Sequence, residues 1–177
     1  MDGIAEIIDD LSSDNSFATT RSGWVLISDR VMGGVSSGSI KRETVAGRTA
    51  VHMRGGVSLE NSGGFLQIAI DLGEAGGPVD ASPWTGIQLD AIGNGQTYNL
   101  HLRTTDIQRP WESYRQSFTA PTQWTQLKLP FTGFIPHRTE SPLRVSRLRR
   151  IGLVAIGREF EVDVAIGDIR FYKASGD

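Results

Sequence analysis

The stretch IQLDAIGNGQTYNLHLR, residues 87–103, contains two runs in which apolar and polar residues alternate, separated by the turn sequence GNG at 93–95. Successive side chains of a β-strand point to opposite faces, so alternation with a period of two indicates a strand with one buried and one solvated face. In the second run, Tyr98, Leu100 and Leu102 share one face and leave the polar residues on the other. The stretch therefore predicts two half-buried β-strands.

The same alternation, or a β-rich run, recurs along most of the chain, at residues 24–28, 50–54, 66–71, 114–118, 125–129, 151–156 and 162–172. Glycine-containing turn sequences separate these segments, and the chain contains 21 glycines, which tight turns favour. Many short strands with few helical patterns are typical of a β-sandwich or barrel. We therefore predict an all-β fold class.

The first residues have a different pattern. Ile4, Ile7, Ile8 and Leu11 follow the i, i+3, i+4, i+7 spacing of one helix face, for about two turns. We predict a short N-terminal helix with a lead-in segment over residues 1–22, followed by a single sandwich domain over residues 23–173.

Composition narrows the function classes. The chain has 177 residues, enough for one domain with a normal core, and a net charge of -2, which gives no general attraction to nucleic acid. It contains no cysteine, which excludes disulfides, thiolate metal sites and a cysteine nucleophile. The acidic start resembles neither a secretory signal nor a mitochondrial presequence, and no apolar segment approaches membrane-spanning length. We expect a cytoplasmic location, no membrane insertion and no nucleic-acid partner.

The segment DRVMGGVSSG, residues 29–38, is the least ordinary stretch of the chain. Gly33 and Gly38 have the spacing of a phosphate-binding loop, but Ser39 stands where that loop requires lysine, and no helical pattern follows. The interpretation that remains is a strand end, a glycine turn and a new strand, in which Asp29 and Arg30 form an ion pair or a turn-capping pair.

DRVMGGVSSG, with Trp24 upstream, resembles the signature of the complex I intermediate-associated protein 30 family. The resemblance extends from about Trp24 to Tyr172, through NSGGF (61–65), YNLHLR (98–103), Tyr114 with Phe118, Trp124, LPF (129–131) and IGL (151–153). It implies a galactose-binding-domain-like jelly roll, related to carbohydrate-binding modules, and it supplies no catalytic residues. In mitochondria the family implies a role in assembling respiratory complex I. The signature residues, which we expect to be structural, are Asp29, Arg30, Met32, Gly33, Gly34 and Ser36.

No catalytic or metal-binding pattern accompanies these motifs. His52, His101 and His137 are the only histidines, and no two of them have the short spacing of a local zinc site. The nucleophile elbow GxSxG is absent. A carboxylate pair for glycoside hydrolysis could be drawn from Asp71 and Asp90, but nothing in the sequence brings them together. We expect no enzyme activity, no metal and no cofactor.

The polar faces of the middle strands are the best candidate for a binding surface. If those strands are neighbours, their polar residues form one wide face rich in hydrogen-bonding groups, suited to sugars or peptide backbone. The alternative is an ordinary solvated outer face. The predicted ligand- or partner-binding residues are Asp90, Asn99, His101, Arg103 and Arg115.

Two further features have open interpretations. Five arginines precede the apolar strand at 151–156, at positions 138, 144, 147, 149 and 150, and could form a basic patch or a solvated loop paired with Glu140, Glu159 and Glu161. Trp84 and Trp111 lie in proline-flanked turn sequences, where they could anchor a partner at the rim or close the ends of the sandwich.

The sequence thus predicts a non-catalytic binding module. The first hypothesis is a chaperone-like assembly factor that binds protein partners, with respiratory-complex subunits as candidates. The second is a carbohydrate-binding module that holds a glycan on its polar sheet face. A third, an enzyme of unrecognised chemistry, would require Asp90, His101 and Arg103 to converge in a closed pocket.

Overall fold

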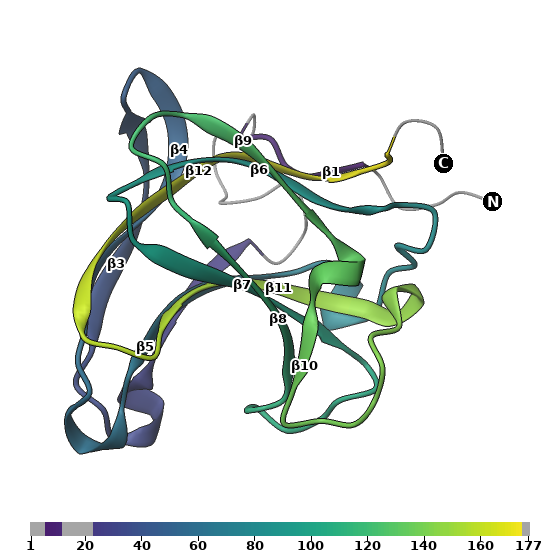
Figure 1. Cartoon of the computed structure of the whole chain (residues 1–177), viewed down its shortest axis with the longest axis horizontal. Helices are drawn as coiled ribbons and strands as arrows, with labels where there is room; N and C mark the ends of the chain where they lie inside the picture. The colour runs from purple at the N-terminus through teal and green to yellow at the C-terminus, as the bar shows by residue number, and fades with distance from the viewer. Residues whose placement is uncertain (1–5, 12–22, 175–177) are drawn as a thin grey trace.

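The computed structural model describes residues 6–11 and 23–174, which form two antiparallel β-sheets stacked face to face (Figure 1). Sheet A has the order β3-β4-β12-β6-β9, with β1 paired to β12, and sheet B has the order β10-β8-β7-β11-β5-β2. The predicted all-β sandwich is confirmed. None of the helical segments in the described residues has the length and apolar character needed to cross a bilayer.

The strands of sheet A are β1 (Ile7–Asp9), β3 (Ser37–Val45), β4 (Arg48–Val57), β6 (Gly86–Gly93), β9 (Thr125–Pro130) and β12 (Phe160–Tyr172). Those of sheet B are β2 (Trp24–Ser28), β5 (Phe65–Asp71), β7 (Thr97–Thr104), β8 (Ser113–Thr119), β10 (Ile135–His137) and β11 (Leu148–Ile156). The connections that the structure describes contain five short 3-10 helices: η1 (Asp29–Met32), η2 (Glu60–Ser62), η3 (Glu74–Gly76), η4 (Phe131–Gly133) and η5 (Val145–Arg147).

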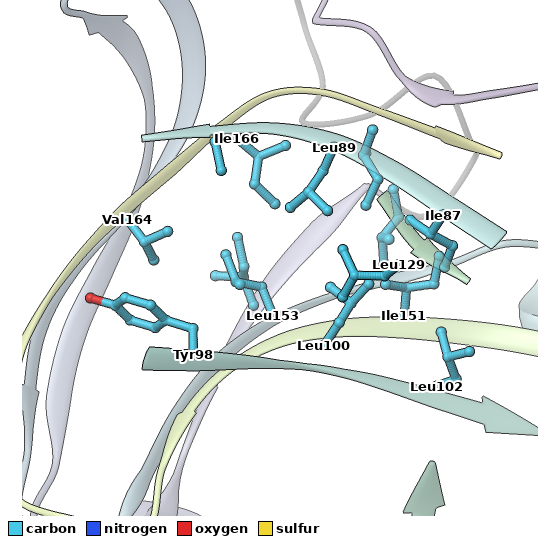
Figure 2. Close-up of a cluster of buried hydrophobic side chains, with 14 of the residues drawn as sticks. Ile87, Leu89, Tyr98, Leu100, Leu102, Leu129, Ile151, Leu153, Val164 and Ile166 are labelled. Carbon is cyan, nitrogen blue, oxygen red and sulfur yellow. The ribbon is translucent and has the colours of Figure 1, made fainter. Parts of the chain in front are cut away.

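The core lies between the sheets and consists of the apolar residues that alternation selects. Leu89 and Ile166 from sheet A face Leu100 and Leu153 from sheet B, and all four are fully buried (Figure 2). Tyr98 is buried with them, and its hydroxyl donates to Asn94 at 2.8 Å. Each strand of the sandwich therefore leaves its other set of side chains on an outer face.

The short N-terminal helix predicted from the isoleucine spacing is wrong where the structure describes that segment. Residues Ile7–Asp9 form β1, which pairs with β12. Asp9 accepts hydrogen bonds from the Leu11 amide at 2.9 Å and from the Trp24 indole at 2.8 Å. Ile4 lies outside the described residues. A helical pattern of two turns is too short to form alone, and pairing with the edge of β12 satisfies the backbone instead.

The chain changes sheets between β6 and β7. These strands follow each other in the sequence, but β6 pairs with β12 and β9, whereas β7 pairs with β8 and β11. The corner is tight, because a Cβ added at Gly93 would lie 2.6 Å from the Cβ of Ala120. The two polar faces of the stretch 87–103 consequently lie on opposite sides of the molecule.

The strands of sheet B bend, so that the outer face of this sheet is concave, between the loops near β5 at one end and β10 at the other (Figure 1). This face carries the polar residues of β7 and β8.

Candidate functional site

Backbone pairing sets the outer residues of sheet B in two rows across the strands. One row runs from Arg115 on β8 through His101 and Gly152 to Ala69 on β5. The adjacent row contains Ser117, Asn99, Val154 and Gln67. Gly152 and Ala69 are small, and the carboxamide of Gln67 lies over Gly152, where an added Cβ would be 2.7 Å from Gln67 Oε1. The small residues leave a hollow beside His101.

Two adjoining cavities occupy this face. The first, of about 300 Å³, is lined by residues that include Phe65, Gln67, His101, Trp111, Arg115 and His137. The second, of about 330 Å³, is lined by residues that include Asn99, Arg115, Ser117, Ile135, Pro136 and His137. Arg115 and His137 line both cavities, so the Arg115 guanidinium lies where the two meet. A polar floor with apolar side chains at its margins is typical of small binding sites.

The cavity is positively charged and partly desolvated. Arg115 is half-buried, and its only hydrogen bond within the described residues runs from Nε to Ser113 Oγ, at 2.9 Å. Burial and the nearby charge of Arg138 lower the pKa of Arg115. Burial, Arg115 and His137 lower the pKa of His101 to about 3. Burial lowers the pKa of His137 as well, with Arg115 and Arg138 adding to the shift. Both imidazoles are therefore neutral at physiological pH, beside an arginine that has no carboxylate partner among the residues that the structure describes.

His101 should make folding sensitive to acid. In the unfolded chain, His101 has its ordinary pKa of 6.5 and takes up a proton below that pH. In the folded protein, the His101 imidazole stays neutral down to its lowered pKa of about 3. Stability should therefore fall as pH drops from 6.5 towards 3, by at most ~1.4 kcal/mol per pH unit. In urea unfolding at pH 7 and pH 5, His101→Gln should show a smaller loss than the wild type. A wild-type His101 resonance that titrates near 6.5 in NMR would contradict this expectation.

Arg103 braces the rim of the site. Its Nη1 donates to the carbonyls of Arg109, Pro110 and Glu112, all in the loop that follows β7. The Glu112 carboxylate accepts from the Arg109 amide at 2.9 Å and closes the same loop. Trp111, at the tip, is 52% exposed and lines the first cavity. Arg103 thus fixes the loop that carries Trp111. The sequence allowed Trp111 either to anchor a partner at the rim or to close an end of the sandwich, and the structure places it at the rim of the first cavity.

Asp90 does not belong to this surface. It lies on the outer face of sheet A, where it accepts from Arg48 Nη2 at 2.7 Å, and the Arg48 guanidinium lies 4.9 Å from the centre of the Trp124 ring. The sequence predicted one wide polar face. The polar residues of β7 and β8 share such a face on sheet B, whereas those of β6 and β9 lie on sheet A. Because Asp90 is separated by the sandwich from His101 and Arg103, these three do not converge in the closed pocket that the enzyme hypothesis required.

The signature segment is built around the buried carboxylate of Asp29. Its Oδ1 accepts from the Ser36 amide at 2.9 Å, and its Oδ2 accepts from Ser36 Oγ at 2.5 Å and from the amides of Gly64 and Phe65 at 2.6 and 3.3 Å. Burial raises the pKa of Asp29, but these hydrogen bonds outweigh it, and the pKa is lowered. A Cβ at Gly34 would lie 2.5 Å from Asp29 Cγ. Asp29 therefore joins DRVMGGVS to NSGGF.

The other signature residues surround this hub. Arg30 is exposed, and its Nε donates to the Ser36 carbonyl at 3.0 Å. Gly33 has the positive φ of 87° that ends η1. The backbone of Met32 closes η1. Asp29 and Arg30 do not form the ion pair that was one interpretation of the motif, because the Asp29 carboxylate is saturated by backbone and serine donors.

The five arginines at positions 138, 144, 147, 149 and 150 do not act as one patch. Arg144 and Arg147 pair with Asp106 at 2.8 and 3.3 Å, and Arg150 pairs with Asp71 at 2.7 Å. The expected partners Glu140, Glu159 and Glu161 are wrong, because the antiparallel register sets Arg150 opposite Asp71 on β5. Among described residues, Arg138 and Arg149 have no carboxylate within ion-pair distance.

Other predicted features lie apart from the concave face. Trp84 stacks on Phe171, with ring centroids 6.3 Å apart, and closes one end of the core. His52 lies on sheet A, with its ring nitrogens 2.7 Å from Glu43 and 2.6 Å from Asp163. Within residues 6–11 and 23–174, no cluster of three or more histidine, aspartate or glutamate side chains could hold a metal ion.

Sequence reasoning missed the apolar part of the site. Phe65, Val154 and Ile156 line the first cavity, and none of them is among the binding residues predicted from the sequence. His137 is also absent from the predicted binding residues, but β10 pairs with β8 and sets it against Ser113. Phe65 and Val154 directly adjoin the buried Leu66 and Leu153 in the sequence. Because successive side chains of a strand point to opposite faces, this alternation could have placed Phe65 and Val154 on the outer face.

Two stacked antiparallel sheets, one with a concave outer face, define a jelly-roll sandwich. The structure resembles that of the family 11 carbohydrate-binding module of Clostridium thermocellum in complex with a β-1,3-1,4-mixed-linked tetrasaccharide, with a TM-score of 0.72, 15% identity, and coverage of 96% of this chain and 95% of that chain. The family 11 module of the cellulosomal cellulase Lic26A-Cel5E of the same organism gives a TM-score of 0.73 at 14% identity, over 98% and 97%. A family 30 module of its cellulase Cel9D-Cel44B gives 0.56 at 12%, over 81% and 94%.

The chain belongs to the complex I intermediate-associated protein 30 (CIA30) family, whose model matches residues 11–169. The resemblance inferred from DRVMGGVSSG is thereby confirmed over nearly the whole chain. Among curated protein sequences, none matches.

Proposed function

We propose that this protein is a non-catalytic interaction module that assists the assembly of a protein complex, and that it binds its partner on the concave outer face of sheet B. Membership of the CIA30 family supports assembly as the biological role. The observation that carries the choice of surface is the half-buried Arg115 between two cavities, without a carboxylate partner among described residues. Partly desolvated arginines and tryptophans are typical of the residues that dominate protein interfaces.

The margins of the face also suit a protein partner. Trp111 and Ile135 are 52% and 69% exposed, and they lie on opposite sides of Arg115, one lining each cavity. Large apolar side chains left in water beside a polar floor favour a partner that buries them. Pro136 lies in the edge strand β10 and has no amide proton, so it disfavours the addition of a further strand there. We therefore expect a partner to lie across the face.

A carbohydrate-binding module is the second candidate. Structural likeness to family 11 modules supports it, since one of them was solved with a bound tetrasaccharide. The hydrogen-bonding groups of Asn99, Ser117 and Gln67 could contact sugar hydroxyls. Against this candidate, Trp111 is the only large aromatic side chain lining the two cavities that is mostly exposed.

Trp111 should act as an interface anchor. Trp111→Ala should weaken partner binding by roughly tenfold or more, because it removes a large, exposed aromatic side chain from the margin of the site. The fold should be unaffected, since the side chain is 52% exposed. Gln126→Ala, an exposed position on β9 of sheet A, is the matched control and should bind normally. Affinity is measured by calorimetry with the captured partner. Equal affinities for the two variants would place the interface elsewhere.

The proposed function is tested by capture from the native cell at about 0.15 M salt, where weak surface attraction is screened. A photo-cross-linking residue at position 117 should capture defined proteins, identified by mass spectrometry as components of one complex, whereas the same residue at position 126 should not. A glycan array run in parallel addresses the second candidate. Binding to β-glucans that is lost in Trp111→Ala, together with no captured protein, would replace the proposed function with the second.

A further inference from the structure

The concave face contains a cationic group that the described part of the fold does not neutralise. Two other arginines of sheet B have partners within the chain: Arg150 pairs with Asp71 at 2.7 Å, and Arg103 donates to three loop carbonyls. Arg115 donates only to Ser113 Oγ and has no carboxylate within ion-pair distance among described residues. Partial burial of an unpaired guanidinium is costly, and its terminal nitrogens carry free donors.

A second unsatisfied group lines the same cavity. Nε2 of His101 is buried and has no hydrogen-bond partner among described residues. In the pairing between β7 and β8, His101 lies directly opposite Arg115. Buried polar atoms are nearly always hydrogen-bonded, so two neighbouring groups without acceptors indicate an acceptor that comes from outside the chain.

We propose that the cavity at Arg115 binds the carboxylate of an acidic residue in an extended segment of the partner protein, with Trp111 and Ile135 contacting apolar side chains on either side of it. The inference rests on the proposed function and specifies what that surface recognises. The planar guanidinium of Arg115 matches a carboxylate with two parallel hydrogen bonds. A neutral His101 can carry its proton on Nε2 and donate to the same group.

The charge and the surroundings favour this occupant over other anions. Arg115 is the half-buried cation of the cavity, whereas Arg138 is exposed at its margin. One buried positive charge matches the single charge of a carboxylate better than the nearly double charge of a phosphate group. The exposed side chains of Trp111 and Ile135 can pack against bulky apolar residues on either side of the acidic residue in a peptide. A free anion has no such apolar groups.

The test titrates the whole protein, by NMR, with four probes. They are the capped peptide acetyl-Ile-Glu-Ile-amide, its Ile-Gln-Ile counterpart, methyl β-glucuronide and inorganic phosphate. The Glu peptide should bind and shift the resonances of His101 and Arg115, and the Gln peptide should bind roughly tenfold more weakly, because it lacks the charged acceptor. Bound Glu peptide should also raise the pH at which His101 takes up a proton, which the Gln peptide should not do.

Arg115→Gln should lower the affinity for the Glu peptide by roughly tenfold, and Arg115→Lys by less, since it keeps the charge without the fork. Arg54→Gln, an exposed arginine on sheet A, is the control and should bind normally. Unchanged thermal unfolding of Arg115→Gln shows that the loss is not a folding defect. If that variant melts early, Arg115→Lys and the His101 titration decide the matter.

Several results would overturn the inference. They are equal binding of the Glu and Gln peptides, no effect of Arg115→Gln, tighter binding of glucuronide or phosphate than of the Glu peptide, and no binding of the Glu peptide at all. The cross-linking result at position 117 is independent of these outcomes. A partner captured there, with no dependence on Arg115, would leave the proposed function standing and reject carboxylate recognition.

Discussion

Asp29→Asn is expected to lower the free energy of unfolding by about 4 kcal/mol, the largest effect we predict for a single substitution. The carboxylate is fully buried and accepts four hydrogen bonds, from Ser36 and from the amides of Gly64 and Phe65. Asparagine keeps the shape but replaces one charged oxygen by an NH2 donor, which would face other donors. Hydrogen bonds to a charged group are worth about 1.5–3 kcal/mol each, and buried donors left without an acceptor add a further penalty.

Asp80→Asn is the matched control. Asp80 also accepts from the amide and hydroxyl of a serine, Ser82, at 2.9 and 2.6 Å, but it is exposed. Its replacement should change stability by less than about 0.5 kcal/mol. Urea unfolding at pH 7 measures both variants. Equal losses would show that Asp29 is not a structural hub.

The same carboxylate sets a pH dependence with a definite sign. The pKa of Asp29 is lowered from its ordinary value of 3.8, so the stabilisation is complete above that pH and is lost as pH falls below it. The wild type should therefore lose more stability than Asp29→Asn between pH 5 and pH 3. His101 contributes in the same direction, so the comparison is made between variants that both retain it.

Gly55→Ala is expected to destabilise the protein by about 3 kcal/mol. Gly55 on β4 is paired with Gly38 on β3, and the two strands approach closely at that point. A Cβ at Gly55 would lie 2.2 Å from the Ser37 carbonyl oxygen and 2.5 Å from the Gly38 Cα. Both are backbone atoms held by strand pairing, so neither can rotate away. The added methyl group would therefore displace the β3–β4 hairpin from the Leu66 side chain, against which the hairpin packs.

The next residue offers a direct comparison. A Cβ at Gly56 would meet nothing within 4 Å, so Gly56→Ala should be neutral within about 1 kcal/mol, or stabilising through the lower entropy of the unfolded chain. Thermal unfolding should separate the two variants by roughly 5–10 °C for a domain of this size. Similar melting temperatures would mean that the hairpin is free to shift.

Much of the fold could be predicted from alternation within each strand. Tyr98, Leu100 and Leu102 were assigned to the core and are fully buried, and Asn99, His101 and Arg103 lie on the outer face as expected. Alternation succeeds because it follows from the geometry of a single strand. Near the N-terminus the helical spacing of the isoleucines was misleading, because β1 is too short to establish a period and pairing with β12 decides its conformation.

The site was only half predictable for a similar reason. Asn99, His101, Arg103 and Arg115 do share one surface, because β7 and β8 are neighbours. Asp90 was grouped with them, but it pairs with Arg48 on sheet A. Nothing local distinguishes a turn that returns the chain to the same sheet from one that carries it to the other, and GNG at 93–95 does the latter.

By itself, the sequence determined the fold class, the family and the buried face of clearly alternating strands such as β7, since these depend on residue types and on their spacing along one chain. Only the tertiary structure decided which strands share a sheet and which arginines find a carboxylate. Charge neutralisation and strand pairing join residues far apart in the sequence. Only the folded structure could therefore set Arg115, which has no carboxylate partner among described residues, beside the buried His101.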